Sequence, residues 1–481
     1  MKTTLIAAAM TLALVPVFAQ VETTPPPPAA PRPVQIPKPV EKTLANGLRV
    51  IVIEKKGVPL VGARLLIRNG GEADPANLPG LADTTASLLS KGTTTRSAEE
   101  IARGVEALGA TMDTGAGWDD SYGDLDVMSS KLQAAMAFLA DVVRHPTFKQ
   151  EEIDRLRKQN IDALSVAMRQ PGRLANFVMT HVIFGTGPYG HNLGGTPESL
   201  ARIKREDIVK FHRDYYRPDN AILVIGGDIA PAKAFAAAQE LFGGWKAAPG
   251  SHPVPLKWSK EFPTPRVVIV DMPSAGQAAV VVGRPGLPRA DSAYPISLVT
   301  NSVLGGGYSS RLNEEIRVKR GLTYGANSSF DLRRGVGPFT ASAQTKNESA
   351  GEVAGLIIDE MNKLETTPVA NDELIPRKAV LIGGFGRQLE TNSGIVGRIG
   401  TLALYGLSLD EINRYISGVQ GVGADDVQKF AAAHLAGTSA SIVIVGDAKK
   451  FLPALQQRFK DVEVIPIDAL DVNSATLRKG K

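Results

Sequence analysis

Apolar and polar residues along this chain follow two periods, which predict strands and helices in alternation. Short apolar or alternating runs in the first half predict strands at 48–54, 60–68 and across 111–128. Apolar residues at helical spacing predict helices at 80–90, 131–144 and 151–168. Ser97 and Glu100 form the S-x-x-E pattern of a capping box, so a further helix is expected after Ser97.

The second half of the chain repeats the pattern of the first. Asp207–Asp228 and Asp426–Asp447 align without a gap at an offset of 219, with eight of 22 positions identical. Each copy has the pattern of an amphipathic helix, a loop and a short apolar strand. A second echo pairs Gly109–Thr111 with Gly321–Thr323, each just after a charged helix. This self-similarity predicts two related α+β lobes.

The predicted lobes cover residues 43–245 and 263–467. The connection between them, 246–262, is rich in Pro, Gly and charged residues, which is typical of a domain boundary.

Both ends of the chain predict segments outside the lobes. Residues 1–19 have the pattern of a secretory signal peptide, with a short apolar run at Leu5–Leu14 and a cleavage site near Ala19. Residues 20–42 are Pro-rich and predict an extended spacer, and residues 468–481 predict a polar tail. The apolar run is too short to span a bilayer, and no other stretch approaches that length. We therefore expect an exported protein of the bacterial periplasm.

Charge and cysteine content exclude several classes of function. The formal charge is +5, but 54 basic residues are nearly balanced by 49 acidic ones scattered along the chain. No Lys/Arg block or basic–aromatic pattern is present, which argues against nucleic-acid binding. The absence of cysteine excludes disulfides and thiolate zinc sites.

The stretch Leu304–Asn327 organises the second half. A turn of three glycines, Gly305, Gly306 and Gly307, leads into a short helix that Gly321 ends, and a strand follows. Period-2 alternation predicts that Leu322, Tyr324 and Ala326 share one face of this strand. Arg317, in the last helical turn, and Tyr324 then flank one tight reversal. By residue type alone, the arginine is favoured by the helix dipole and the tyrosine belongs to a core.

This stretch resembles the second-half signature of the pitrilysin/insulinase family of zinc metallopeptidases, in its bacterial and mitochondrial-processing-peptidase branch. The resemblance covers about residues 43 to 465, and its most specific parts are the frame Gly80–Thr93 and the segment Arg317–Tyr324. It implies two lobes, each a mixed, mostly antiparallel sheet backed by helices, that form half of a clam-shaped unit. It also implies that Arg317 and Tyr324, seven residues apart, contact the bound peptide at the cleavage centre.

The metal motif of that family is missing here. In H-x-x-E-H the two histidines lie on one helix face and bind zinc, while the glutamate activates water. Asp83 and Ser87 stand at the histidine positions and Ala86 at the glutamate position. The later glutamate ligand falls on Ala163, or on Asp162 or Leu164 if the alignment shifts by one. We expect no metal or other cofactor bound by this chain, with zinc in a partner subunit.

Other candidate sites are weaker. No two of the six histidines are four residues apart, and we interpret them as structural or exposed. The acidic run 119–126 lacks the ligand spacing of a calcium loop, and we interpret it as a solvated strand and turn. The glycines at 305–307 are not followed by the Lys-Ser/Thr of a phosphate loop, and no G-x-S-x-G is present.

These observations lead to one functional hypothesis and two alternatives. The chain is expected to be the non-catalytic, substrate-binding subunit of an exported heteromeric zinc metallopeptidase that degrades peptides. Its partner is expected to be a homologous subunit with H-x-x-E-H, and the glycine turn at 305–307 is expected to lie next to the substrate. That turn is shorter than the glycine-rich loop of the mitochondrial zinc-less subunit, which favours a bacterial peptidase. The alternatives are a stand-alone peptide-binding scaffold and an independent hydrolase with an unrecognised site.

Overall fold

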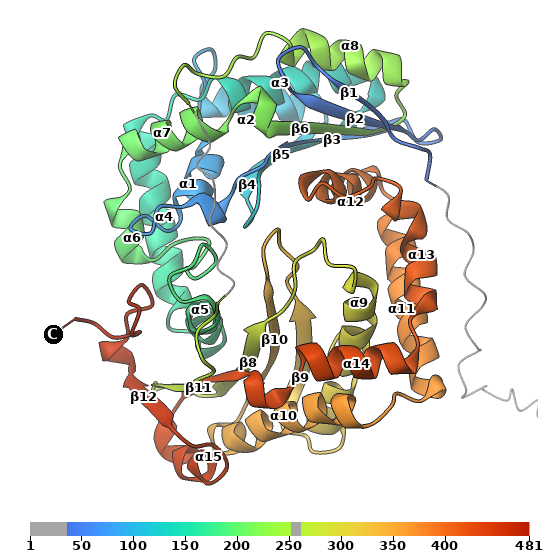
Figure 1. Ribbon diagram of the computed structural model, residues 1–481. Helices are drawn as coiled ribbons and strands as arrows, with labels where there is room; N and C mark the ends of the chain where they lie inside the picture. The colour runs from blue at the N-terminus through green and yellow to red at the C-terminus, as the bar shows by residue number, and fades with distance from the viewer. Residues whose placement is uncertain (1–35, 252–260, 481) are drawn as a thin grey trace, which may run out of the picture.

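A computed structural model describes residues 36–251 and 261–480 and contains two six-stranded mixed sheets, one in each lobe (Figure 1). The first sheet has the order β1-β2-β6-β3-β5-β4, and its neighbouring strands are antiparallel except for β2 and β6. Its strands are β1 (Val40–Thr43), β2 (Arg49–Glu54), β3 (Leu60–Ile67), β4 (Thr111–Ala116), β5 (Ser121–Met128) and β6 (Ala221–Gly227).

The second sheet has the order β12-β7-β11-β8-β10-β9, and β7 is parallel to both of its neighbours. Its strands are β7 (Val267–Asp271), β8 (Ala278–Pro285), β9 (Thr323–Phe330), β10 (Pro338–Thr345), β11 (Ser441–Gly446) and β12 (Val462–Pro466). The five strands from β7 to β11 repeat the arrangement of β2, β3, β4, β5 and β6, while β1 and β12 extend the two sheets differently.

Helices surround both sheets. Those of the first lobe are α1 (Leu81–Leu88), α2 (Ala98–Ala107), α3 (Leu132–Arg144), α4 (Gln150–Ala167), α5 (Pro171–Phe184), α6 (Pro197–Arg202), α7 (Arg205–Tyr215) and α8 (Pro231–Phe242). Those of the second lobe are α9 (Tyr294–Leu304), α10 (Ala350–Thr366), α11 (Asn371–Gln388), α12 (Asn392–Leu404), α13 (Glu411–Gly421), α14 (Ala424–His434) and α15 (Leu452–Arg458). The capping box at Ser97 and Glu100 is confirmed at the start of α2.

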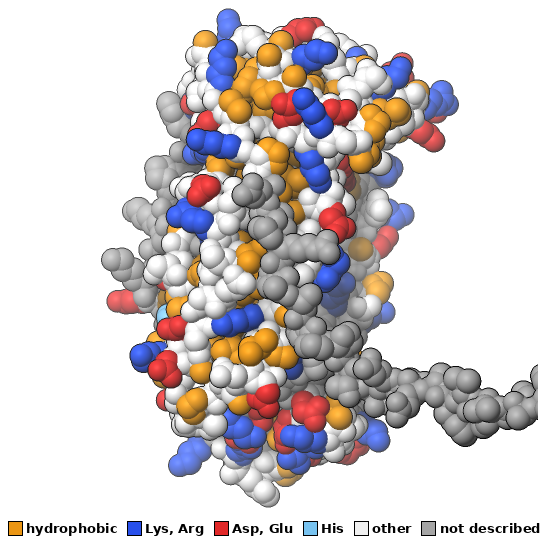
Figure 2. All heavy atoms as spheres, turned by 90° about the vertical axis from the view of Figure 1, so that its right-hand side faces the viewer, with side chains coloured by type: hydrophobic (Ala, Val, Ile, Leu, Met, Phe, Trp, Pro, Cys, Tyr) orange, Lys and Arg blue, Asp and Glu red, His pale blue; other side chains and the backbone are white. Residues whose placement is uncertain are grey.

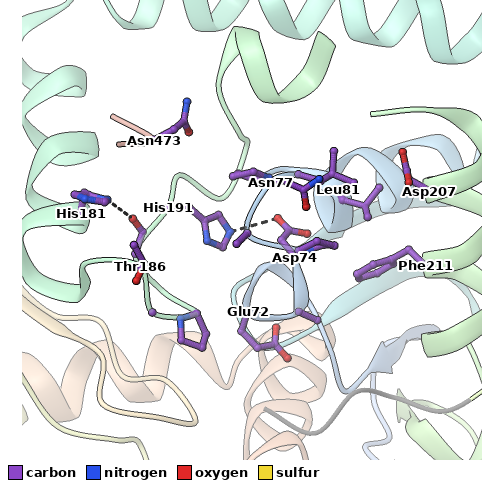
Figure 3. A pocket seen from close by; sticks show the side chains of 18 of the residues that line it. Glu72, Asp74, Asn77, Leu81, His181, Thr186, His191, Asp207, Phe211 and Asn473 are labelled. Atoms are coloured by element: carbon purple, nitrogen blue, oxygen red, sulfur yellow. Dashed lines mark hydrogen bonds and ion pairs between the residues drawn. The ribbon is translucent and has the colours of Figure 1, made fainter. Parts of the chain in front are cut away.

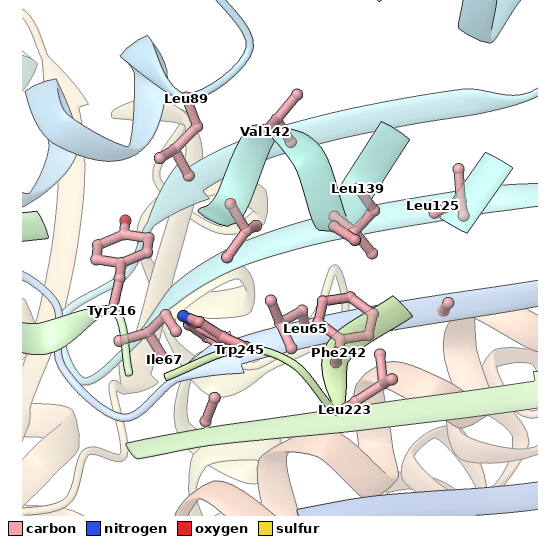
Figure 4. Packing of buried hydrophobic residues seen from close by; sticks show 14 of the residues in the cluster. Leu65, Ile67, Leu89, Leu125, Leu139, Val142, Tyr216, Leu223, Phe242 and Trp245 are labelled. Carbon is pink, nitrogen blue, oxygen red and sulfur yellow. The ribbon is translucent and has the colours of Figure 1, made fainter. Parts of the chain in front are cut away.

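The outer face of each sheet packs on helices of its own lobe. In the first lobe, Leu65 and Leu223 of the sheet meet Leu139 of α3 and Phe242 of α8 in one buried cluster (Figure 4). These side chains are at most 1% exposed, so this cluster is a close-packed core.

The inner face of each sheet is covered by a helix of the other lobe. Helix α12 of the second lobe lies against β3 and β6, and α5 of the first lobe lies against β8 and β11 (Figure 1). Ile399 of α12 packs with Ile53 and Val224, and Val178 of α5 packs with Val281 and Val443. Because each lobe buries the other's sheet, the two lobes form one structural unit.

The internal duplication extends to these helices. The offset of 219 found in the sequence carries α7 onto α14 and places α5 over α12. The second echo also has a structural basis, since Gly109 has a φ of 63° and Gly321 a φ of 64°. Both glycines make the same left-handed turn before an edge strand, β4 or β9.

Two expectations about the ends of the lobes are wrong. The first sheet begins at Val40, inside the segment expected to be a spacer, because β1 pairs with β2. The segment expected to be a polar tail packs: Leu470, Val472 and Leu477 are buried in the cluster around α5. Its few apolar residues are enough to anchor it there. The signal-peptide prediction and most of the Pro-rich segment lie outside the described residues.

On the face shown in Figure 2, basic and acidic side chains are interspersed. Within residues 36–251 and 261–480, no helix combines the length and apolar character needed to cross a bilayer.

Candidate functional site

Helix α1, which carries the positions of the missing metal motif, is firmly anchored. The buried carboxylate of Asp74 accepts hydrogen bonds from the N–H groups of Gly80 at 2.7 Å and Ala82 at 2.8 Å. It thereby satisfies two of the unpaired donors at the helix N-terminus. Gly80 precedes the helix with a φ of 91°, a conformation suited to glycine.

The residues at the motif positions do not fit a zinc ion. Burial, and then the nearby Asp74, raises the pKa of Asp83 to about 6. Ala86 is fully buried in the core, and its methyl group cannot act as a base. Ser87 is half-buried. Ala163 on α4 is exposed. In the described part of the chain, no three His, Cys, Asp or Glu side chains come together in a way that suits a metal ion.

The two alternative positions for the third ligand are no better. Asp162 is exposed on α4, and Leu164 packs against the core of the first lobe.

Tyr324 stands at the edge of a groove in the second lobe. The tyrosine is 92% exposed, although Ala326, two residues along β9, is fully buried. The pairing of β9 with β10 is irregular between Ala343 and Thr345, opposite the start of β9. The expectation that Tyr324 shares the buried face of Ala326 is therefore wrong, and so is its interpretation as a core residue.

The groove next to Tyr324 has a volume of about 720 Å³ and lies between the start of α5 and the strands β8, β10 and β9. The floor of the groove is polar because alternate residues of β10 and β9 face it. Asn327, Ser342 and Gln344 lie on this side, and the Ser342 hydroxyl is 3.3 Å from Asn327 Oδ1. The wall formed by α5 includes Arg173 and Asn176. Since β9 is an edge strand, its outer backbone groups lack a neighbouring strand.

Arg317 lies close in sequence but outside the lining of this groove. The helix that carries it is a π-helical turn, Asn313–Val318, and Gly321, with a left-handed φ of 64°, ends the helical stretch as expected. The Arg317 guanidinium lies 4.4 Å from the ring centre of Tyr308, which is 72% exposed. The reversal thus brings Tyr324, but not Arg317, to the groove.

The glycine turn packs against the middle of β9. The Ser328 N–H donates to the Gly305 carbonyl at 3.1 Å, and a Cβ at Gly305 would lie 2.5 Å from Ser328. Asn313 ties the turn to the strand: it donates to the Gly307 carbonyl at 3.1 Å and accepts from the Ala326 N–H at 3.0 Å. Neither the three glycines nor Asn313 lines the groove, so their contacts position β9. The role of Asn313 has no signal in the sequence.

A second cavity of about 700 Å³ lies in the first lobe beside the loop 185–191 (Figure 3). His191 Nε2 is 3.3 Å from Asp74, and His181 Nδ1 is 3.1 Å from the Gly190 carbonyl. Burial lowers the pKa of His181, which favours its neutral form. Both histidines thus hold the loop in place, in agreement with their structural interpretation.

The acidic run contains a residue that joins the two lobes. Asp119 is 1% exposed, and its carboxylate accepts hydrogen bonds from the hydroxyls of Tyr189 and Tyr405 and from the Arg334 N–H. The interpretation of the run as solvated is wrong at Asp119. The loop between β9 and β10, which carries Arg334, makes this contact possible.

The same loop supplies a second anchor. The guanidinium of Arg333, a residue that is only 4% exposed, packs 4.2 Å from the ring centre of the half-buried Trp118 in a cation–π contact. The Arg334 guanidinium lies 3.5 Å from Glu72. Burial, reinforced by Asp119, nevertheless raises the pKa of Glu72 to about 8.

Comparison with known proteins gives the family. The model of the insulinase family, peptidase family M16, matches residues 49–192, and that of the peptidase M16 inactive domain matches residues 202–379. An uncharacterized zinc protease of Streptomyces coelicolor is 25% identical over 411 residues, 85% of this chain and 89% of that protein.

Two solved structures share the fold. The peptidase M16 inactive domain from Pseudomonas fluorescens superposes with a TM-score of 0.80 and 28% identity, covering 85% of this chain and 98% of that one. A protease from Helicobacter pylori superposes with a TM-score of 0.80 and 20% identity, covering 85% of this chain and 100% of that one. The fold is therefore the two-lobed α+β half-structure of M16 proteins. The chain belongs to the M16 peptidase family, the insulinase and pitrilysin family, which uses zinc.

Proposed function

We propose that this chain is the non-catalytic, substrate-binding subunit of an exported heteromeric zinc metallopeptidase that degrades peptides. A homologous partner with an intact H-x-x-E-H motif brings the zinc ion and the base that activates water. One observation carries the proposal: a 92% exposed tyrosine stands over a polar groove in a family member whose own metal positions do not fit zinc.

The groove suits an extended peptide. Asn313 and Gly305 already accept hydrogen bonds from the outward N–H groups of Ala326 and Ser328. The peptide strand therefore pairs with the edge of β9 at its start, near Tyr324. Main-chain pairing of this kind recognises the backbone of the peptide more than the peptide's sequence. The exposed Tyr324 then stands beside the bound segment.

Tyr324 and Arg317 supply the chemistry of this chain. The Tyr324 hydroxyl donates a hydrogen bond to the scissile carbonyl and stabilises the oxyanion as negative charge develops. The Arg317 guanidinium, which rests on the exposed ring of Tyr308 outside the groove lining, donates to a carbonyl of the bound peptide beyond the groove. Asn313 and the turn at Gly305–Gly307 hold β9 so that Tyr324 keeps its place.

The test is Tyr324→Phe in the complex reconstituted with an H-x-x-E-H homologue. Loss of one oxyanion donor is expected to lower kcat on the order of 10²–10³-fold. Tyr308→Phe is the matched control, because it removes an exposed hydroxyl from the same segment and keeps the ring under Arg317. Equal turnover in the wild type and Tyr324→Phe would leave the tyrosine without a catalytic role.

A stand-alone peptide-binding protein is the second candidate. It is favoured by the polar lining of the groove, where amides, hydroxyls and Arg173 can bind a peptide without a metal ion. It predicts peptide affinity for the isolated chain and no gain in cleavage on mixing with a zinc-bearing homologue.

The proposed location is the bacterial periplasm, on the basis of the pattern in residues 1–19. N-terminal sequencing of the protein from a periplasmic extract is expected to begin just after Ala19.

A further inference from the structure

The lining of the groove beside Tyr324 carries charge of one sign only. Among the described residues that line it, Arg173 is the one charged side chain, and the other polar groups are amides and hydroxyls. Arg173 lies in the first turn of α5 and is exposed. Within the described chain its guanidinium has no hydrogen-bond, acidic or aromatic partner. Its five donors are thus open to a ligand in the groove.

The corresponding face of the first lobe has the opposite character. There Arg64 of β3 lies 3.3 Å from Asp124 and 3.6 Å from Asp120, so its charge is compensated within the lobe. In the second lobe the equivalent strands carry Ser342 and Gln344 instead of carboxylates. Both lobes thus have a polar inner surface, but acidic side chains accompany the arginine only in the first.

Local packing holds Arg173 near the floor of the groove. A Cβ at Gly172 would lie 2.7 Å from Gln344 Nε2, so the start of α5 is pressed against the end of β10. Pro171, the first residue of α5, restricts the backbone conformation two residues before Arg173. The guanidinium therefore projects from a rigid element at the same end of the sheet as Tyr324.

We infer that the groove selects peptides that present a carboxylate next to the segment passing Tyr324, and that Arg173 is the residue that selects them. This inference rests on the proposed function, in which the groove holds a peptide. A guanidinium binds a carboxylate through two parallel hydrogen bonds, and no acidic group of the described lining competes for it. The carboxylate comes either from an aspartate or glutamate side chain or from the free C-terminus of the peptide.

The test measures binding of fluorescein-labelled peptides to the full chain by fluorescence anisotropy. One set of ten-residue peptides carries a single glutamate at each position in turn, and a matched set carries glutamine there. Both sets are made with a free and with an amidated C-terminus, which separates the two sources of the carboxylate. The chain is used as wild type, Arg173→Gln, Arg173→Glu and the control Arg169→Gln, an exposed arginine four residues away that does not line the groove.

The wild type is expected to bind the favoured glutamate peptide, or the free-acid peptide, about three- to tenfold more tightly than its neutral match. Arg173→Gln abolishes the preference, Arg173→Glu reverses it, and Arg169→Gln retains it. If the wild type shows no preference for a carboxylate, or if the preference persists in Arg173→Gln, this inference is wrong. The proposal that the groove binds a peptide is then unaffected. Failure of every peptide to bind overturns the peptide groove as well.

Discussion

The backbone N–H of Arg334, in the second lobe, donates a 2.7 Å hydrogen bond to the buried carboxylate of Asp119, in the first lobe. Two tyrosine hydroxyls, from Tyr189 and Tyr405, donate to the same carboxylate. A single aspartate thus receives three donors from three separate parts of the chain. This network fixes how the lobes meet, at the opposite end of β9 and β10 from Tyr324.

Replacing Asp119 by asparagine is expected to destabilise the protein. The amide NH₂ would face a donor, leaving a buried polar group unpaired, which lowers the free energy of unfolding by about 2–4 kcal/mol. Urea denaturation monitored by tryptophan fluorescence measures this loss. Asp126→Asn is the control, because Asp126 also crosses the lobes, to Ser393, but on the exposed surface. Equal losses in the two variants would contradict the role of Asp119.

Glu72 is expected to make stability depend on pH. Its pKa rises from an ordinary 4.5 to about 8 in the folded chain, so the folded state binds the proton more tightly. This contribution to stability is fully present below pH 4.5 and is lost as the pH rises to about 8. The slope is at most about 1.4 kcal/mol per pH unit.

Urea midpoints of the wild type and Glu72→Gln between pH 5 and pH 8 measure this term. Other buried carboxyls, such as Asp83, add slopes of the same sign in both proteins, so the difference isolates Glu72. Glu72→Gln is expected to lose less stability than the wild type over this range. Parallel curves would show that Glu72 is ionised throughout.

The fold was predictable from the sequence where its cause is local. Local patterns in the sequence indicate the capping box at Ser97 and the end of the helix at Gly321. The repeat at an offset of 219 is visible because two stretches of the sequence align without a gap. The burial of Asp119 depends on Arg334 and Tyr405, more than 200 residues away, and leaves no local pattern. The packing of α5 and α12 on the sheet of the other lobe also leaves no local pattern, since the apolar spacing within a helix does not indicate which sheet it covers.

The site was predictable only in part for the same reason. The positions Asp83, Ala86 and Ser87 follow from the family resemblance, because the motif lies within one helix. The exposure of Tyr324 depends instead on the irregular register between β9 and β10, which simple alternation does not include. The groove itself combines α5 with strands of the other lobe, so no single stretch of sequence encodes it.

The two equivalent glycines, Gly109 and Gly321, are expected to respond alike to alanine. Both have φ near +60° and no atom within 4 Å of an added Cβ, so only backbone strain changes. Each substitution is expected to lower the free energy of unfolding by about 1–2 kcal/mol. Gly307→Ala is the control, because Gly307 has equally open space and no left-handed backbone. A loss of similar size at Gly307, measured by urea denaturation, would argue against strain as the cause.

Separating the lobes is expected to leave each sheet incompletely covered. A fragment of residues 36–251 lacks α12 and exposes Ile53 and Val224, which that helix buries in the full chain. Such a fragment should bind the dye ANS and lose cooperative unfolding, as loosely packed states do. Adding the fragment 261–480 should suppress the dye signal. A first-lobe fragment that unfolds cooperatively without binding ANS would show that α12 is dispensable for its core.

The most direct measurement is zinc content and peptide cleavage, first for the purified chain alone and then for the chain mixed with an H-x-x-E-H homologue. We predict no stoichiometric zinc and no cleavage for the chain alone, and cleavage by the mixture that a chelator abolishes. One tightly bound zinc ion per chain, together with peptide cleavage in the absence of any partner, would contradict the division of roles proposed for the two subunits.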